Sequence, residues 1–100
     1  MKPLKDDTWK SRVDLIDATM LLELWNILRL WAEKYAENSW QGIPPNKHIA
    51  ACLRHIYRYQ EWEEFDPETN MSHLIHAIAN LMFVNYNEKF ITKEIEKWKI

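Results

Sequence analysis

Hydrophobic residues recur along this chain at the three- and four-residue spacing of α-helices, and no long segment alternates as a β-strand would. The clearest repeat predicts a helix that Asp17 caps and that ends near Glu37. We expect its apolar stripe to lie in the core: Leu21, Leu24, Trp25, Leu28, Trp31, Ala32 and Tyr35. A single glycine and four prolines leave few places for tight hairpin turns, so the sequence predicts an all-α fold.

Three more helices are predicted after breaks that are rich in Asn, Ser, Gly and Pro. Each has a capping residue and an approximate last residue: Asn46 and Glu63, Ser72 and Tyr86, and Asn87 and Trp98. A turn at Asp66-Pro67 separates the second helix from the third. Four helices in 100 residues predict one domain, residues 1–100, folded as a small four-helix bundle.

Composition narrows the range of partners. The net charge of -2 and the pI near 6.1 provide no basic footprint for nucleic acid, so nucleic acid is not expected as a partner. No apolar run reaches the roughly 18 residues of a membrane span. The N-terminal residues 1–10 also lack the apolar centre of a signal peptide. We therefore expect a cytoplasmic protein with no membrane partner.

All four histidines fall on the two middle helices. His48 and His55 are seven residues apart on the second helix, and the side of the third helix that carries His73 and His76 also carries Asn80. Acidic residues lie between these helices: Glu61, Glu63, Glu64, Asp66 and Glu68. Carboxylates with imidazoles suit Mg²⁺, Mn²⁺ or, with more histidines, another transition metal. The same spacing fits a polar packing pair beside a solvent-facing acidic run, so both interpretations stay open.

Several familiar chemistries have no counterpart in the sequence. It contains no phosphate-binding glycine loop, no paired-cysteine zinc motif, no His-Asp dipeptide and no Gly-x-Ser-x-Gly elbow. A helical site made of carboxylates and histidines remains.

The order of several motifs gives a further indication of family. The motifs lie between residues 12 and 85: Arg12-x-Asp14-Leu15, Ala32-x-Lys34-Tyr35, Trp40-x-Gly42-Ile43-Pro44, Ala51-x-x-Arg54-His55, Glu63-x-x-Asp66-Pro67-Glu68 and His73-Leu74-x-His76-Ala77-x-x-Asn80. In this order they resemble the small phage-encoded dATP/dGTP diphosphohydrolase family, which is described as similar to the MazG-like all-α nucleotide pyrophosphohydrolases.

The resemblance implies an activity and a set of site residues. It implies that water attacks the α-phosphate of a deoxypurine nucleoside triphosphate, with Mg²⁺ or Mn²⁺ as cofactor, and releases pyrophosphate and a monophosphate. The implied catalytic residues are His55, Glu63, Asp66, His73 and His76, and the last four of these are also the implied metal ligands. The implied substrate-binding residues are Lys34, Tyr35, Trp40, Arg54 and Asn80. The resemblance also implies a homo-oligomer, either a dimer or a tetramer.

The chain departs from the family pattern at several glycines. The family commonly has glycine where this chain has Trp31, Ala36, Trp62 and Asn70, and we expect the bulky replacements to narrow or reshape a pocket. This departure keeps an alternative open, a non-catalytic protein that binds a nucleotide or a nucleotide-derived signal. A third hypothesis is an interaction module in which the tryptophans are partner hot spots.

Overall fold

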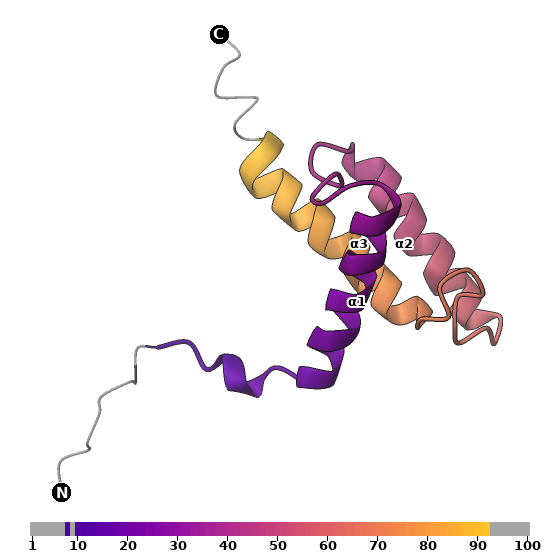
Figure 1. Ribbon diagram of the computed structural model, residues 1–100, viewed down its shortest axis with the longest axis horizontal. Helices are drawn as coiled ribbons and strands as arrows, with labels where there is room; N and C mark the ends of the chain where they lie inside the picture. The colour runs from indigo at the N-terminus through magenta and orange to yellow at the C-terminus, as the bar shows by residue number, and fades with distance from the viewer. Residues whose placement is uncertain (1–7, 9, 93–100) are drawn as a thin grey trace, which may run out of the picture.

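The computed structural model describes residue 8 and residues 10–92, and their regular structure is helical (Figure 1). It comprises a short 3₁₀ turn η1, three α-helices and a π-helical segment η2: η1 Val13–Leu15, α1 Ala18–Lys34, α2 Pro45–Gln60, α3 His73–Tyr86 and η2 Asn87–Thr92. The described residues contain no strand, only an isolated antiparallel bridge between Phe65 and Ser72. The predicted all-α class is confirmed.

Of the four predicted helix caps, Asp17 and Ser72 are confirmed, and Asn46 and Asn87 are wrong. The Asp17 carboxylate accepts hydrogen bonds from the backbone N–H groups of Thr19 and Met20, and the Ser72 hydroxyl accepts one from Leu74. Asn46 does not cap α2, because the helix already begins at Pro45. Proline suits the first helical position, since its φ is already helical and its missing N–H would have no helical partner there.

Two helices end earlier than predicted because the backbone turns into the left-handed region. α1 ends at Lys34 instead of Glu37, because Ala36 has a φ of 145°. α2 ends at Gln60 instead of Glu63, because Trp62 has a φ of 71°. A helix cannot continue through such residues.

The predicted start of a fourth helix at Asn87 is wrong. Asn87 has helical dihedral angles, a φ of -61° and a ψ of -40°, so α3 runs directly into η2. Its amide Nδ2 donates to the carbonyl oxygen of Trp40 instead of capping a new helix. The remainder of the predicted helix, from residue 93 to Trp98, lies outside the described residues. Three α-helices therefore form the described part, and a four-helix bundle is not confirmed.

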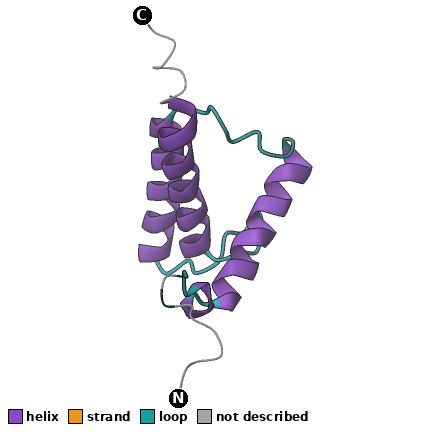
Figure 2. Cartoon of the chain, turned by 90° about the vertical axis from the view of Figure 1, so that its left-hand side faces the viewer, coloured by secondary structure: helices purple, strands orange, loops and turns teal. Residues whose placement is uncertain are grey.

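The three helices form an antiparallel pair, α2 and α3, with α1 inclined against it on the α3 side (Figure 2). The buried hydrophobic cluster lies between α1 and α3 and consists of Ile27, Trp40, Ile75, Ala79 and Phe83. The loop between α1 and α2 contributes to this core, because the Trp40 ring stacks on Phe83 with ring centroids 4.6 Å apart. The hydrophobic cluster is thus formed by α1, α3 and the loop before α2, while α2 packs against α3.

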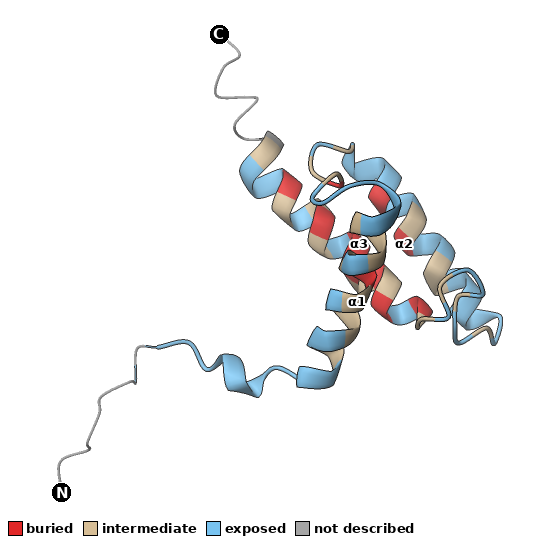
Figure 3. Ribbon diagram, in the orientation of Figure 1, coloured by how far each residue is buried: buried red, intermediate tan, exposed pale blue. Residues whose placement is uncertain are grey.

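The predicted apolar stripe of α1 is buried only in part. Leu24, Leu28 and Trp31 pack against the core, whereas Trp25 and Tyr35 are 57% and 56% exposed. Figure 3 shows how exposure increases toward η1 and the first turns of α1. The expectation that the whole stripe lies in the core is wrong, because α1 packs against α3 along one side.

No helix of the described residues is both long enough and apolar enough to cross a membrane.

Candidate functional site

Three of the predicted site residues form one compact group of potential metal ligands. His55 of α2, His73 of α3 and Asp66 of the connecting loop each offer one ligand atom, and these atoms lie within 4.8 Å of one another. The Nδ1 atoms of His55 and His73 are 2.8 Å apart, and Asp66 Oδ2 is 3.7 Å from His55 Nδ1. Two imidazole nitrogens and one carboxylate oxygen are a donor set that divalent transition metals accept.

The loop between α2 and α3 holds Asp66 in this position. The backbone N–H of Asp66 donates to the Met71 carbonyl at 2.8 Å, and the N–H of Asn70 donates back to the Asp66 carbonyl. The side-chain Oδ1 accepts the backbone N–H of Glu68 at 2.7 Å, which leaves Oδ2 facing His55. The Asp-Pro turn that the sequence predicts therefore fixes which carboxylate oxygen faces the histidines.

Glu63 borders the same cleft as this group and contacts the second ring nitrogen of His73. Its Oε1 accepts a hydrogen bond from His73 Nε2 at 2.7 Å. In a neutral His73 the proton is then on Nε2, so Nδ1 is an acceptor and receives the Nδ1–H of His55. If a divalent cation replaced the proton between the two Nδ1 atoms, both of these atoms would be its ligands. Glu63 would then orient His73 from behind, as carboxylates do for many metal-bound histidines.

His76 lies beside the ligand group without being a member of it. Its ring stacks on that of His55 with an interplanar angle of 4° and centroids 4.4 Å apart. Its Nε2 is 2.7 Å from the hydroxyl of Thr69. The structure brings four of the predicted residues together: His55, Glu63, Asp66 and His73. His76 lies next to them and is not a member of the ligand group, although the resemblance implies that it is a metal ligand.

Burial favours the neutral form of His55 and of His76. Burial and then the nearby His76 lower the pKa of His55 from 6.5 to about 4. Burial also lowers the pKa of His76, and Asp66 opposes this effect. A neutral imidazole is the form that binds a metal, so His55 can bind a cation at neutral pH without first losing a proton.

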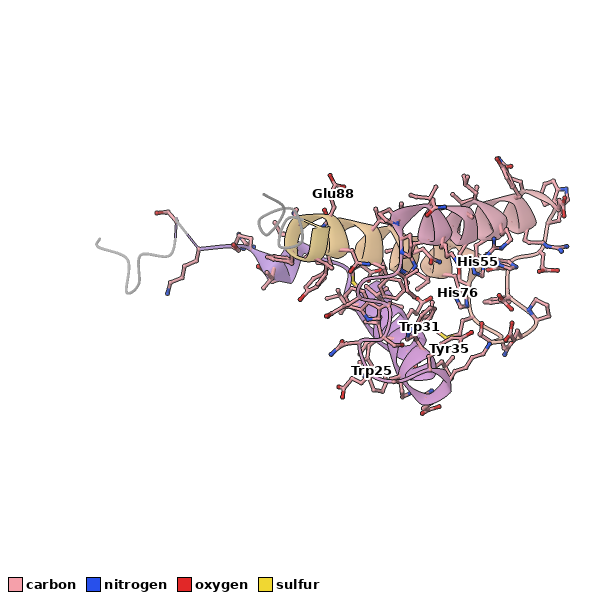
Figure 4. The ribbon with its side chains drawn as sticks, turned by 90° about the horizontal axis from the view of Figure 1, so that it is seen from above. Trp25, Trp31, Tyr35, His55, His76 and Glu88 are labelled. Atoms are coloured by element: carbon pink, nitrogen blue, oxygen red, sulfur yellow. The ribbon has the colours of Figure 1, made fainter. Side chains whose placement is uncertain are left out.

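Two clefts meet at the ligand group. The first, of about 460 Å³, is lined by Arg54, His55, Arg58, Glu63, Asp66, Pro67, Glu68 and His73. The second, of about 280 Å³, lies between α1 and the α2–α3 pair and shares four of these residues: Arg54, His55, Asp66 and Glu68. Figure 4 shows Trp31 and Tyr35 of α1 opposite His55 and His76 around this second cleft. We call them the arginine cleft and the aromatic cleft.

The remaining predicted substrate-binding residues are divided between the aromatic cleft and the core. Lys34, Tyr35 and Asn80 border the aromatic cleft. Lys34 pairs with Glu68 at 2.9 Å, and this hydrogen bond raises the pKa of the lysine. Trp40 lines neither cleft, because it is 8% exposed and its ring is stacked within the core. The structure places Trp40 away from the site.

Some residues that border the clefts were not predicted as site residues, among them Glu68, which borders both. Arg58 borders the arginine cleft, and its spacing of four from Arg54 on α2 is a signal that the sequence does contain. Thr69 holds His76, but it lies in a loop whose path the sequence does not predict. The structure also assigns His48, which is 3% exposed with Nε2 at 3.3 Å from the Trp40 carbonyl, to the core.

Comparisons with known proteins identify the family of this chain. Residues 2–97 match the family described as dATP/dGTP diphosphohydrolase, N-terminal. This chain belongs to that family. It is 31% identical over 84 residues to a protein of Salmonella phage PMBT28 named dATP/dGTP diphosphohydrolase, and the match covers 84% of this chain and 29% of that relative. This chain thus corresponds to less than a third of the relative's length. No solved structure shows a significant match.

The backbone conformation can be compared with the four positions at which the resemblance implies glycine, namely Trp31, Ala36, Trp62 and Asn70. Three of the four positions have a positive φ, with values of 145° at Ala36, 71° at Trp62 and 57° at Asn70. Glycine is favoured at such positions because of its backbone freedom. Trp62 is 96% exposed and lines neither cleft, so it does not fill a pocket at the site. The expected effect on a pocket is therefore absent from both clefts for Trp62, whereas Trp31 does border the aromatic cleft.

Proposed function

We propose that this chain hydrolyses a deoxynucleoside triphosphate with the help of a divalent cation and releases pyrophosphate and a monophosphate. One observation carries the proposal: the ligand group of His55, Asp66 and His73 opens into the same cleft as two arginines, Arg54 and Arg58. A triphosphate requires both a cation and cationic side chains around its charged oxygens. The name of the phage relative supports the same reaction class.

Each group of the arginine cleft has a task in this reaction. Arg54 and Arg58 bind phosphate oxygens and orient the α-phosphorus for attack. A bound cation would stabilise negative charge on the phosphate and lower the pKa of water. Water forms a bond to the α-phosphorus, the bond from this phosphorus to the bridging oxygen breaks, and pyrophosphate leaves. Glu63 accepts the proton of the water, because it borders this cleft and lies outside the ligand group.

The donor set favours Mn²⁺ over Mg²⁺. Mg²⁺ prefers oxygen ligands, whereas imidazole nitrogen suits transition metals. With two histidines and one aspartate in the group, we expect activity at lower concentrations of Mn²⁺ than of Mg²⁺.

We also propose that the protein is a homo-oligomer. Four large apolar side chains of η1 and α1 are more than half exposed: Val13, Leu15, Leu22 and Trp25. Exposed apolar residues that are clustered in this way are typical of protein interfaces. Light scattering on the native protein and on Leu22→Glu tests this proposal. We expect a dimer or tetramer that dissociates in the variant, and a native monomer would contradict it.

Incubation of the protein with each deoxynucleoside triphosphate, with either Mn²⁺ or Mg²⁺, tests the proposed reaction. Chromatography should show monophosphate and pyrophosphate, with purine substrates preferred, and no product in EDTA. Asp66→Asn should abolish the products, because it removes the one carboxylate of the ligand group. Intact triphosphates with every metal would contradict the proposal.

A matched pair of arginine variants tests the phosphate contacts. Arg58→Ala should raise KM about tenfold, because a charged hydrogen bond contributes about 1.5–3 kcal/mol. Arg29→Ala is the control, since Arg29 is exposed on α1, pairs with Glu33 and lines neither cleft. An equal effect of the two substitutions would remove Arg58 from the substrate site.

A further inference from the structure

Asn80 of α3 has an amide whose orientation is determined by a single hydrogen bond. Its Nδ2 donates to the carbonyl oxygen of His76 at 2.9 Å. A carbonyl oxygen only accepts, so the amide cannot be turned the other way without losing this bond. The Oδ1 atom has no hydrogen-bond partner among the described residues, and Asn80 is 8% exposed at the edge of the aromatic cleft.

Among the described residues, the one fully buried side-chain N or O atom without a partner is Asn87 Oδ1, so Asn80 Oδ1 is an accessible acceptor at the cleft. A ligand in the cleft can supply a donor to this oxygen in place of water. The hydrogen bond from Nδ2 to the His76 carbonyl would be enough for a purely structural role of Asn80. Such a role does not explain why the acceptor Oδ1 lies at the cleft.

The rest of the aromatic cleft suits a flat, aromatic ligand. Its apolar lining comes from all three helices: Ile27, Leu30, Trp31, Ala51, Ala79 and Phe83. Tyr35 borders the same space and is 56% exposed, so its ring is accessible for stacking. The volume of about 280 Å³ is at the lower end of the range for small-molecule pockets, which fits one ring system better than a whole nucleotide.

We infer that the aromatic cleft is the nucleobase subsite and that Asn80 Oδ1 accepts a hydrogen bond from an exocyclic amino group of the base. Asparagine side-chain amides recognise bases that carry an amino group through such hydrogen bonds, and adenine is the most common example. The inference rests on the proposed function, because it places the base on one side of the ligand group and the phosphates on the other. His55 and Asp66 border both clefts, so a single nucleotide could extend across them.

A pair of substrates that differ by one amino group tests the inference. We would measure kcat/KM for dATP and for the 2′-deoxyribonucleoside triphosphate of unsubstituted purine, which lacks the amino group. The native protein should prefer dATP by about ten- to a hundredfold, as one well-placed base contact provides. Asn80→Leu should reduce this preference to near one, while Asn85→Leu, at an exposed position of the same helix, should keep it.

The outcomes separate this inference from the proposed reaction. Equal use of the two substrates by the native protein would overturn the role of Asn80 and leave hydrolysis intact. If neither substrate is hydrolysed, calorimetric titration of the native protein with both nucleotides still decides the point. Tighter binding of dATP would support the subsite without catalysis, and equal or absent binding would overturn it. If Asn80→Leu is unfolded by circular dichroism, Asn80→Ser replaces it with the same expectation.

Discussion

The Nδ1 atoms of His55 and His73 lie 2.8 Å apart, although the two residues are eighteen positions apart in the sequence. The antiparallel packing of α2 on α3 creates this contact, and the loop that joins the helices adds Asp66 to it. The candidate site is therefore a product of the tertiary fold, since neither helix contains it alone. Several consequences of this arrangement can be measured.

Glu63→Gln should weaken the binding of Mn²⁺ about 10- to 100-fold, which is the usual effect of removing an orienting carboxylate behind a metal-bound histidine. The physical reason is the 2.7 Å hydrogen bond between Glu63 and His73 Nε2. At saturating Mn²⁺ a deficit in kcat should remain, because Glu63 is also the proposed base. Titration calorimetry checks the first effect and steady-state kinetics the second. Glu64→Gln, at an exposed neighbouring position, should change neither.

The stability of the metal-free protein should fall on acidification below about pH 6.5. The pKa of His55 is lowered from 6.5 to about 4 in the folded state, so the unfolded chain binds more protons between these values. The stability that depends on neutral His55 is fully present above pH 6.5 and is lost as the pH falls toward 4. The loss should be at most about 3 kcal/mol, since one pKa unit corresponds to about 1.4 kcal/mol.

Urea unfolding in EDTA at pH 7.5 and pH 5 measures this loss. His55→Gln should show a smaller difference between the two pH values than the native protein. A native free energy of unfolding that is the same at both values would contradict the neutral, buried state of His55.

Trp62→Gly should stabilise the protein by about 1 kcal/mol. Trp62 has a φ of 71°, which costs an ordinary residue roughly 1–2 kcal/mol, and its 96% exposed ring gives little packing in return. Asn70→Gly, at a φ of 57°, should give a smaller gain, because asparagine tolerates this conformation better. Urea unfolding compares the three proteins, and a less stable Trp62→Gly would show that the indole has a contact that offsets the strain.

Asn87→Ala should destabilise the protein by about 1–3 kcal/mol, the usual effect of breaking a buried hydrogen bond. Asn87 is 2% exposed, and its Nδ2 donates to the carbonyl oxygen of Trp40, which also lies 3.3 Å from His48 Nε2. The substitution therefore releases the loop between α1 and α2 from the end of α3. Asn85→Ala is the exposed control on the same helix, and equal unfolding midpoints for the two variants would contradict this anchoring role.

Much of the helical structure was predictable because helix signals are local. Asp17 and Ser72 cap helices through hydrogen bonds within three residues, and a sequence pattern contains all of that information. Asn87 has the same capping chemistry, but its amide is used by a loop more than forty residues away. Its role depends on tertiary packing, and for this reason the predicted fourth helix start was wrong.

The candidate site was predictable in its residue types and less so in its geometry. The helical spacing places His73 and His76 on one side of α3, yet only His73 joins the ligand group. The difference depends on how α2 crosses α3, which stacks the His76 ring on His55 and places its Nε2 on Thr69. The sequence pattern contains neither this crossing nor the path of the loop.

Binding of Mn²⁺ to His73→Ala and His76→Ala, followed by electron paramagnetic resonance, tests most directly that His55, Asp66 and His73 hold one catalytic cation. The account predicts one bound ion per native chain, loss of the ion in His73→Ala, and retention in His76→Ala, with hydrolysis of deoxynucleoside triphosphates lost together with the ion. A native protein that binds no Mn²⁺, or a His76→Ala variant that loses it as fully as His73→Ala, would contradict the account.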